Sequence, residues 1–317
     1  MSQTQTKASI RWGSRQTLAR VGAVTCAALI IGAAVFVAAK RPSDSVHSAI
    51  PTQPVRYLGV YEPGAPRSYA GVTTFTTATG VRTDVVLYFS QWLESFQVRF
   101  ATSAAENGAT PVVQIDPTDV DLGAIAAGQY DGYLSTYAES VRSYRHPVIL
   151  SFGHEMNGNW YSWGYQHTSP GTFVAAWRHI VTLFRTLGVR NVTWMWTVNI
   201  MALGGIPSPA PWWPGSAYVN WIGIDGYYYK PSWTFTSLFG PTIAAVRGLT
   251  SDPILIAETG AAPAEGQPAK IANLFAGVRL YGLLGFVWFD VRDWRIRSPS
   301  AVAAFRRGAK AYHMPAP

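Results

Sequence analysis

Cysteine is almost absent from this chain, and charge is scarce. The one cysteine, Cys26, lies in an apolar stretch near the N-terminus, so residues 40–317 can form no disulfide, thiol nucleophile or cysteine-ligated metal site. Charged residues make up only 13% of the 317 residues, whereas hydrophobic residues make up 48%. The chain can therefore build the core of one large α/β barrel or of two ordinary domains.

Acidic residues are missing from the first 41 positions, which hold six basic residues. The net charge of +8, taken alone, suggests a nucleic-acid or acidic partner. Without these six residues the chain has 19 basic against 17 acidic residues, a net charge of only +2. The basic character belongs to the N-terminus, so we expect no nucleic-acid partner for the remainder.

Residues 21–39 contain no charge at all, and they are long enough to cross a bilayer as a helix. Four basic residues precede them and two follow, which favours a cytoplasmic N-terminus. We interpret 1–20 as a cytoplasmic basic segment, 21–39 as a transmembrane anchor or a signal peptide, 40–55 as a linker and 56–317 as the folded domain. The folded domain is then exported, either anchored to the cell membrane or secreted after cleavage.

Eight short apolar runs, rich in β-branched and aromatic residues, follow the linker. They are residues 57–62, 84–90, 110–116, 147–153, 191–199, 221–227, 253–258 and 285–290. Their apolar character is nearly continuous rather than alternating, which is typical of strands buried on both faces.

Helical patterns separate several of these runs. The clearest covers 169–188, with Ser169 as N-cap, Pro170 in the first turn and Gly188 at the end. Its apolar face consists of Phe173, Trp177, Ile180, Val181 and Phe184. We also expect helices within 91–107, 129–145, 236–249 and 268–282. Residues 200–218, rich in proline and glycine, predict a long loop that forms a cleft wall.

This order of elements predicts an α/β fold, a (β/α)₈ TIM barrel preceded by a single N-terminal hydrophobic helix. Such a barrel takes ~250 residues, and the eight units here span about 235. A doubly wound open sheet is the alternative, but no glycine-rich phosphate-binding pattern follows the first run. In a barrel the functional residues lie at the carboxyl ends of the strands. His154, Glu155, Glu258 and Asp290 all occupy such positions.

The segment SFGHEMNGNWYSWG, residues 151–164, places a His–Glu pair directly after the fourth run. A zinc protease needs H-E-x-x-H on a helix, but Gly158 stands where the second histidine belongs. We therefore expect no metal here. A buried His154–Glu155 pair with a purely structural role is the alternative to a catalytic one.

A second glutamate, Glu258, ends the seventh run in ILIAETG. A carboxylate buried without a partner is costly, so two glutamates emerging toward one barrel mouth indicate paired chemistry. Two carboxyl groups can hydrolyse a glycosidic bond when one donates a proton and the other attacks the anomeric carbon. Aromatic rings supply flat faces for sugars, and several flank the strand ends: Trp160, Tyr161, Trp163, Trp212, Trp213, Tyr227 and Trp288.

These segments resemble glycoside hydrolase family 26, the β-mannanase family, over about residues 57–291. HEMNGNWYSWG resembles the family's strand-four motif, and AETG looks like its nucleophile position. GIDGYYY is similar to its sixth strand, and WFD to the site of a sugar-stacking tryptophan. The resemblance implies Glu155 as acid/base and Glu258 as nucleophile.

The same resemblance implies roles for other residues. His154 is expected near the nucleophile or the sugar 2-hydroxyl, Tyr227 beside Glu258, and Trp288 under a sugar ring. Trp160 and Trp163 are candidate sugar-binding rings. Where many members carry a histidine after strand three, this chain has Gln114 and Asp116, which puts the mannose preference in doubt.

Glu62, after the first run, either binds a sugar hydroxyl or faces solvent. The sequence thus predicts a retaining endo-β-glycanase acting on β-1,4-mannan-type polysaccharide, with no cofactor and no metal. A β-1,3-1,4-glucanase, another cell-wall glycosidase or a transglycosylase on the same barrel is the alternative within enzymes. A non-catalytic carbohydrate-binding barrel is the alternative outside them.

Overall fold

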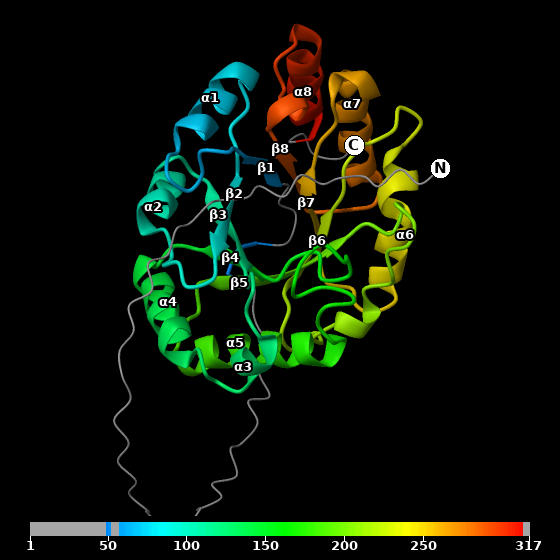
Figure 1. Ribbon diagram of the computed structural model, residues 1–317. Coiled ribbons are helices and arrows are strands. Elements are labelled where there is room, and N and C mark those ends of the chain that lie inside the picture. The colour runs from blue at the N-terminus through cyan, green and yellow to red at the C-terminus, as the bar shows by residue number, and fades with distance from the viewer. Residues whose placement is uncertain (1–48, 52–56, 313–317) are drawn as a thin grey trace, which may run out of the picture. The chain divides into compact units, whose positions relative to one another are not determined.

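The computed structural model describes residues 49–51 and 57–312 (Figure 1). The expected basic segment and the expected anchor or signal peptide lie outside these residues, as does nearly all of the expected linker. Among the helices of the described residues, none has the length and apolarity needed to span a membrane.

Eight parallel strands in the described residues close into a barrel in sequence order, with β1 paired to β8. They are β1 (Tyr57–Tyr61), β2 (Val85–Gln91), β3 (Thr110–Asp116), β4 (Val148–Phe152), β5 (Val192–Asn199), β6 (Trp221–Asp225), β7 (Ile254–Thr259) and β8 (Gly285–Phe289). Each coincides with one of the eight predicted apolar runs, so the barrel is confirmed and the doubly wound sheet is excluded.

Helices surround the strands as a ring (Figure 1). Within the described residues they are α1 (Ala70–Thr79), α2 (Val98–Glu106), α3 (Leu122–Ala126), α4 (Asp131–Tyr144), α5 (Pro170–Thr186), α6 (Phe235–Arg247), α7 (Gln267–Leu280) and α8 (Pro299–Tyr312). Residues 200–220, all of them described, contain no α-helix. They form the expected loop with one 3₁₀ turn, η1 (Ala210–Trp212).

Helix α5 confirms its sequence signals. The Ser169 side chain accepts a hydrogen bond from the backbone N–H of Thr172, and Pro170 lies in the first turn. Helices α1, α3 and α8 were not predicted. Alanine and threonine carry much of their patterning, as at Ala301 and Ala304 on the buried face of α8, and such residues give a weak periodic signal.

The strands separate two cores. Outward side chains pack against the helices, whereas inward ones such as Leu87, Ile149, Met195 and Leu255 fill the barrel itself. Residues 49–51 contribute to the inner core, because Ile50 is buried there and the Tyr57 hydroxyl donates to the Pro51 carbonyl at 2.6 Å. The interior is therefore a packed core and not a channel.

Toward the carboxyl ends of the strands the inward row becomes polar. Gln114, Ser151, Thr197 and Asp225 are all completely buried there. The barrel consequently presents its polar chemistry at the rim, where the loops after the strands meet.

Candidate active site

Glu155 is positioned by a tight turn after β4. Its backbone is left-handed, with φ of 54°, and Gly153 two residues earlier has φ of 57°. For a glutamate this conformation costs roughly 1–3 kcal/mol, and such strain is concentrated at functional sites. The backbone N–H of Glu155 donates to the Thr197 carbonyl at 3.0 Å, which fixes the turn to β5.

Both carboxylate oxygens of Glu155 accept hydrogen bonds. The Trp160 indole N–H donates to Oε2 at 2.7 Å, and the Asn199 amide donates to Oε1. The Glu155 side chain is only 2% exposed. Buried carboxylates need such donors, because an unpaired charge in the interior is strongly unfavourable.

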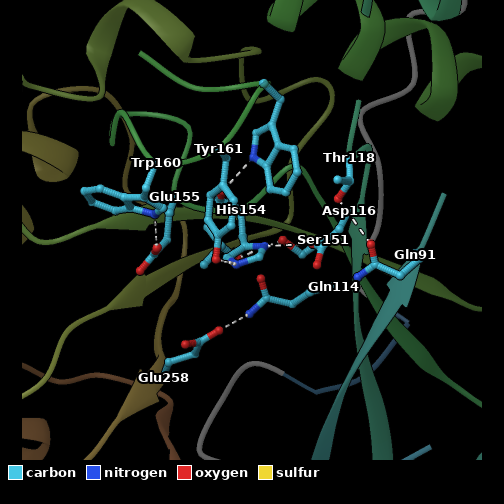
Figure 2. A network of polar contacts seen from close by, with 12 residues as sticks. Gln91, Gln114, Asp116, Thr118, Ser151, His154, Glu155, Trp160, Tyr161 and Glu258 are labelled. Carbon is cyan, nitrogen blue, oxygen red and sulfur yellow. Dashed lines mark hydrogen bonds and ion pairs between the residues drawn. The ribbon is translucent and has the colours of Figure 1, made fainter. Parts of the chain in front are cut away.

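Glu258 reaches the same space from β7 (Figure 2). Its Oε1 accepts from the Gln114 amide at 2.9 Å, and its Oε2 accepts from the Tyr227 hydroxyl at 2.5 Å. Glu258 is 5% exposed. The pair of glutamates at one barrel mouth, expected from the sequence, is therefore present, with each carboxylate held by two donors.

A β-bulge directs Glu258 inward. Ala257 already belongs to the inner core, so in a regular strand the next side chain would point outward toward the helices. The pairing between β6 and β7 shifts, however, from Ile224↔Ile256 to Asp225↔Glu258. The extra residue returns Glu258 to the inward row of Asp225, which is a recognised use of bulges beside active sites.

His154 pairs with a third acid, Asp116, beside the glutamates. Its Nδ1 lies 3.0 Å from Oδ1 of Asp116, and its Nε2 lies 3.1 Å from the Tyr161 hydroxyl. Burial, the largest influence, lowers the pKa of His154, but Asp116, Glu258 and Glu155 together raise it above its ordinary value. Asp116, Glu155 and Glu258 thus lie around His154 at the barrel mouth (Figure 2).

Two tyrosines border the carboxylates. Burial first, and then the charges of Glu155 and Glu258, hold the pKa of Tyr161 and of Tyr227 well above the ordinary value. Both hydroxyls consequently keep their protons over the physiological range, and Tyr227 remains a donor to Glu258. The sequence-based expectation that Tyr227 lies beside Glu258 matches this placement.

The aromatic candidates divide into accessible and buried rings. Trp160 is half-buried. Trp163 is 1% exposed, stacks on Tyr161 at 4.3 Å between ring centroids and donates to the His154 carbonyl, and Trp288 is completely buried. The expectation that Trp163 and Trp288 offer a face to a sugar is not met, because protein atoms cover both rings.

Trp294, which was not predicted as a site residue, lies beside both Tyr227 and Trp288. It follows β8 in the 3₁₀ turn η3 (Arg292–Trp294) and is half-buried. Its ring stacks on Tyr227 at 4.2 Å between centroids, and its carbonyl accepts from the Trp288 indole at 2.9 Å. Its only sequence signal was its position after a strand end.

Glu62 and Asp290 form a second carboxyl pair at the rim. They follow the paired positions Tyr61 and Phe289 of β1 and β8, and they are 8% and 5% exposed. Burial raises the pKa of Glu62 to about 8, aided by a hydrogen bond to Asp290 and its charge and opposed by Arg295 and Arg297. Glu62 neither faces solvent nor contacts the catalytic candidates in these interactions, and its binding of a sugar stays a prediction.

This carboxyl pair predicts a pH-dependent stability. The folded protein keeps a proton on Glu62 up to about pH 8 that the unfolded chain releases near its ordinary pKa of 4.5. The free energy of unfolding therefore decreases as pH rises through this window. Glu62→Gln should flatten that decrease, measured as the change in Tm between about pH 5 and about pH 9. Glu106→Gln, at an exposed position on α2, is the control; an unchanged pH slope in Glu62→Gln would contradict the assignment.

One cluster among the described residues has the atoms for a metal ion. A ligand atom from each of His154, Asp225 and Glu258 lies within 4.8 Å of the others. The His154 nitrogens already contact Asp116 and Tyr161, and Glu258 accepts two hydrogen bonds. His154 and Glu258 thus already have protein partners, and the cluster by itself assigns no resident metal.

The fold and the site together define a class: a TIM barrel with two buried glutamates at the ends of β4 and β7, the arrangement of barrel glycoside hydrolases. Residues 91–264 match the profile of Glycosyl hydrolase family 26, and the chain belongs to this family. The family expected from the sequence motifs is therefore confirmed.

Individual relatives support the same family. Endoglucanase H of Acetivibrio thermocellus is 32% identical over 263 residues, covering 77% of this chain and 29% of that protein. A mannan endo-1,4-beta-mannosidase of Bifidobacterium adolescentis is 25% identical over 148 residues, 43% of this chain and 15% of that protein. The chain thus spans less than a third of the length of these relatives. An endo-beta-1,4-mannanase structure from Cellulomonas fimi has the same fold, with a TM-score of 0.64 and 18% identity over 80% of this chain and 70% of that one.

Proposed function

We propose that this protein is a retaining, endo-acting β-glycanase that hydrolyses β-1,4-mannan-type polysaccharide. The observation that carries the proposal is the pair Glu155 and Glu258, each buried at the same barrel mouth and each held by two hydrogen-bond donors. Membership of glycosyl hydrolase family 26 supports it. The endo-acting mode is part of the proposal: an open rim built from the loops after the strands would let polymer extend past the cleavage point on both sides.

The proposed mechanism has two displacements. In the first, Glu155 donates a proton to the glycosidic oxygen while Glu258 attacks the anomeric carbon, so the leaving sugar departs with that proton and a glycosyl–Glu258 ester forms. In the second, Glu155 takes a proton from water, whose oxygen displaces Glu258 from the anomeric carbon. Configuration is inverted twice and so retained.

The neighbours of the glutamates have distinct parts in this proposal. Tyr227 and Gln114 orient the attacking carboxylate of Glu258. His154, which pairs with Asp116, lies beside Glu258 at the reacting centre. The half-buried rings of Trp160 and Trp294 are the platforms proposed for sugars on the two sides of the cleavage point, since stacking needs an accessible ring face.

A glucan backbone is the second candidate substrate. The relative that matches 77% of the chain is named an endoglucanase, whereas the mannanase relative matches 43%. Mannose and glucose units differ only in the orientation of the hydroxyl at C2, so the same two-glutamate mechanism serves either backbone. Mixed-linkage β-1,3-1,4-glucan is therefore the natural competitor to β-1,4-mannan.

The substrate is tested with full-length protein on β-1,4-mannan, mixed-linkage β-1,3-1,4-glucan and xylan. We expect a rapid loss of mannan viscosity with few new reducing ends, followed by oligosaccharides, and NMR of the first products should show the β-anomer. Turnover of the mixed-linkage glucan alone would select the second candidate. Release of α-anomers, or no product from any polymer, would contradict the proposal.

We also propose that the barrel works outside the cytoplasm. The uncharged segment 21–39 supports this, either as an anchor that tethers the protein to the membrane or as a signal peptide removed on export. Cell fractionation with N-terminal sequencing of the mature protein distinguishes the two. Recovery of the protein in the cytosol with an intact N-terminus would contradict export.

A further inference from the structure

Glu155 depends on a buried amide at the end of β5. Asn199 is 1% exposed, and its Nδ2 donates to Oε1 of Glu155. Trp160, which also donates to this carboxylate, is half-buried in a loop. Asn199, in contrast, is held in place by a barrel strand, so it can define where the Glu155 carboxyl group lies.

A second asparagine fixes Asn199. The side chain of Asn157 accepts from the Asn199 backbone N–H at 2.8 Å and donates to the Asn199 carbonyl at 2.9 Å. It also donates to the Pro207 carbonyl at 3.4 Å. Asn157 is completely buried and lies in the same loop as Glu155. It therefore joins the acid/base loop to the strand that carries the carboxylate's donor.

The amide oxygen of Asn199 indicates which contact orients the Asn199 side chain. This buried Oδ1 has no hydrogen-bond partner within residues 49–51 and 57–312. A buried amide that serves only packing normally satisfies both of its ends, since an unsatisfied group costs about 1–3 kcal/mol. Here the N–H group is directed at Glu155, whereas no residue that the structure describes donates to the oxygen.

Gln114 repeats this arrangement at the other glutamate. It is completely buried on β3, its Nε2 donates to Oε1 of Glu258, and its own Oε1 likewise has no partner among the described residues. The side chains of Gln91 and Thr118, drawn in the same view, hydrogen-bond to each other and not to Gln114 (Figure 2). Each glutamate is thus served by its own buried amide from a different strand.

We propose that Asn199 is the positioning residue of the acid/base Glu155, and that Asn157 holds Asn199 in place for this task. The proposal rests on the proposed function, since it assigns proton transfer to Glu155. Asn199 contacts neither the nucleophile nor its donors in the interactions described above, so its loss impairs proton transfer more than nucleophilic attack. Gln114, which contacts the nucleophile, serves as the comparison.

The test compares two leaving groups in the full-length enzyme. A polymer bond needs the proton from Glu155, whereas 2,4-dinitrophenolate leaves without one. We therefore compare kcat/KM, which reports the first displacement, on β-1,4-mannan and on 2,4-dinitrophenyl β-mannobioside. Mixed-linkage glucan and 2,4-dinitrophenyl β-cellobioside replace them if the polymer panel selects glucan. The variants are Asn199→Ala, the near-isosteric Asn199→Asp, Asn157→Ala and Gln114→Ala.

For Asn199→Ala and Asn199→Asp we expect kcat/KM on the polymer to fall about 100-fold, the scale of general acid catalysis, and on the aryl glycoside only about fivefold. Asn157→Ala should also lower kcat/KM more on the polymer than on the aryl glycoside, but by a smaller factor. Gln114→Ala should lower both values by a similar factor. Equal losses on both substrates in the two Asn199 variants, or no loss in Asn199→Asp, would overturn the proposal.

Glu155→Gln separates this proposal from the function on which it rests. If Glu155→Gln loses polymer activity selectively and the Asn199 variants do not, Asn199 is not the positioning residue but the function stands. If Glu155→Gln leaves kcat/KM on both substrates unchanged, the proposed function itself fails. Thermal unfolding of each variant identifies losses of activity caused by misfolding, which lower kcat/KM on both substrates together.

Discussion

Glu258→Ala is expected to abolish hydrolysis, lowering kcat by on the order of 10⁴-fold or more, because the proposed covalent intermediate forms on the Glu258 carboxylate. Both donors to Glu258 come from strands or strand ends that do not depend on its side chain, namely Gln114 and Tyr227. The vacated site should therefore keep its shape. It leaves room for a small anion where the carboxylate stood.

Azide gives this prediction its specificity. Added azide should restore turnover of a 2,4-dinitrophenyl glycoside by Glu258→Ala and yield the glycosyl azide with inverted configuration, identified by NMR. Glu106→Ala, an exposed change on α2, should retain wild-type activity. Wild-type activity in Glu258→Ala, or a rescued product of retained configuration, would exclude Glu258 as the nucleophile.

Glu155→Ala should show the second-largest effect, and it should depend on the leaving group. We expect kcat/KM on polymer to fall by about 10²–10⁴-fold, the range that general acid catalysis contributes. On a 2,4-dinitrophenyl glycoside the first displacement should proceed almost normally, because that leaving group needs no proton. The glycosyl–Glu258 ester should then accumulate, since the general base for its hydrolysis is missing.

Two readouts test this second prediction. A burst of dinitrophenolate should precede slow turnover, and azide should accelerate the slow phase while giving a glycosyl azide of retained configuration. That stereochemistry is opposite to the outcome for Glu258→Ala, so the two roles can be told apart. Equal losses of kcat/KM on the polymer and the activated substrate would contradict the assignment of Glu155 as acid/base.

Much of the fold could be predicted because buried parallel strands have a strong local signature. The run 110–116 coincides with β3, and the other seven runs overlap their strands. Helix α5 could be predicted equally well, from its N-cap and its apolar face. Helices α1 and α8 were missed, since the alanine and threonine residues on them say little about which face is buried.

The catalytic candidates could be predicted because a parallel barrel brings the carboxyl ends of all its strands to one rim. Glu258 is distant in sequence from the adjacent pair His154 and Glu155, but all three lie at or just after the carboxyl end of a strand. Their buried neighbours were harder to find. Asn199 and Gln114 lie within apolar strands, and nothing in a strand's sequence tells which polar side chain meets which carboxylate across the barrel.

The sequence also could not predict which aromatic rings are accessible. Trp160, Trp163 and Trp288 all flank strand ends, yet only Trp160 keeps part of its ring uncovered. Whether a ring is covered depends on how the chain packs around it, as when the turn after β8 brings the Trp294 carbonyl onto the Trp288 indole N–H.

The sequence by itself determined the barrel, the rim and the two glutamates, because these follow from local apolar patterning and strand order. Only the tertiary structure decided how the side chains of the two glutamates are oriented. Glu258 points inward only because a bulge inserts a residue opposite β6, and Glu155 lies in a left-handed turn anchored to the Thr197 carbonyl. Both depend on pairing between strands, an interaction that the residues of one strand do not encode.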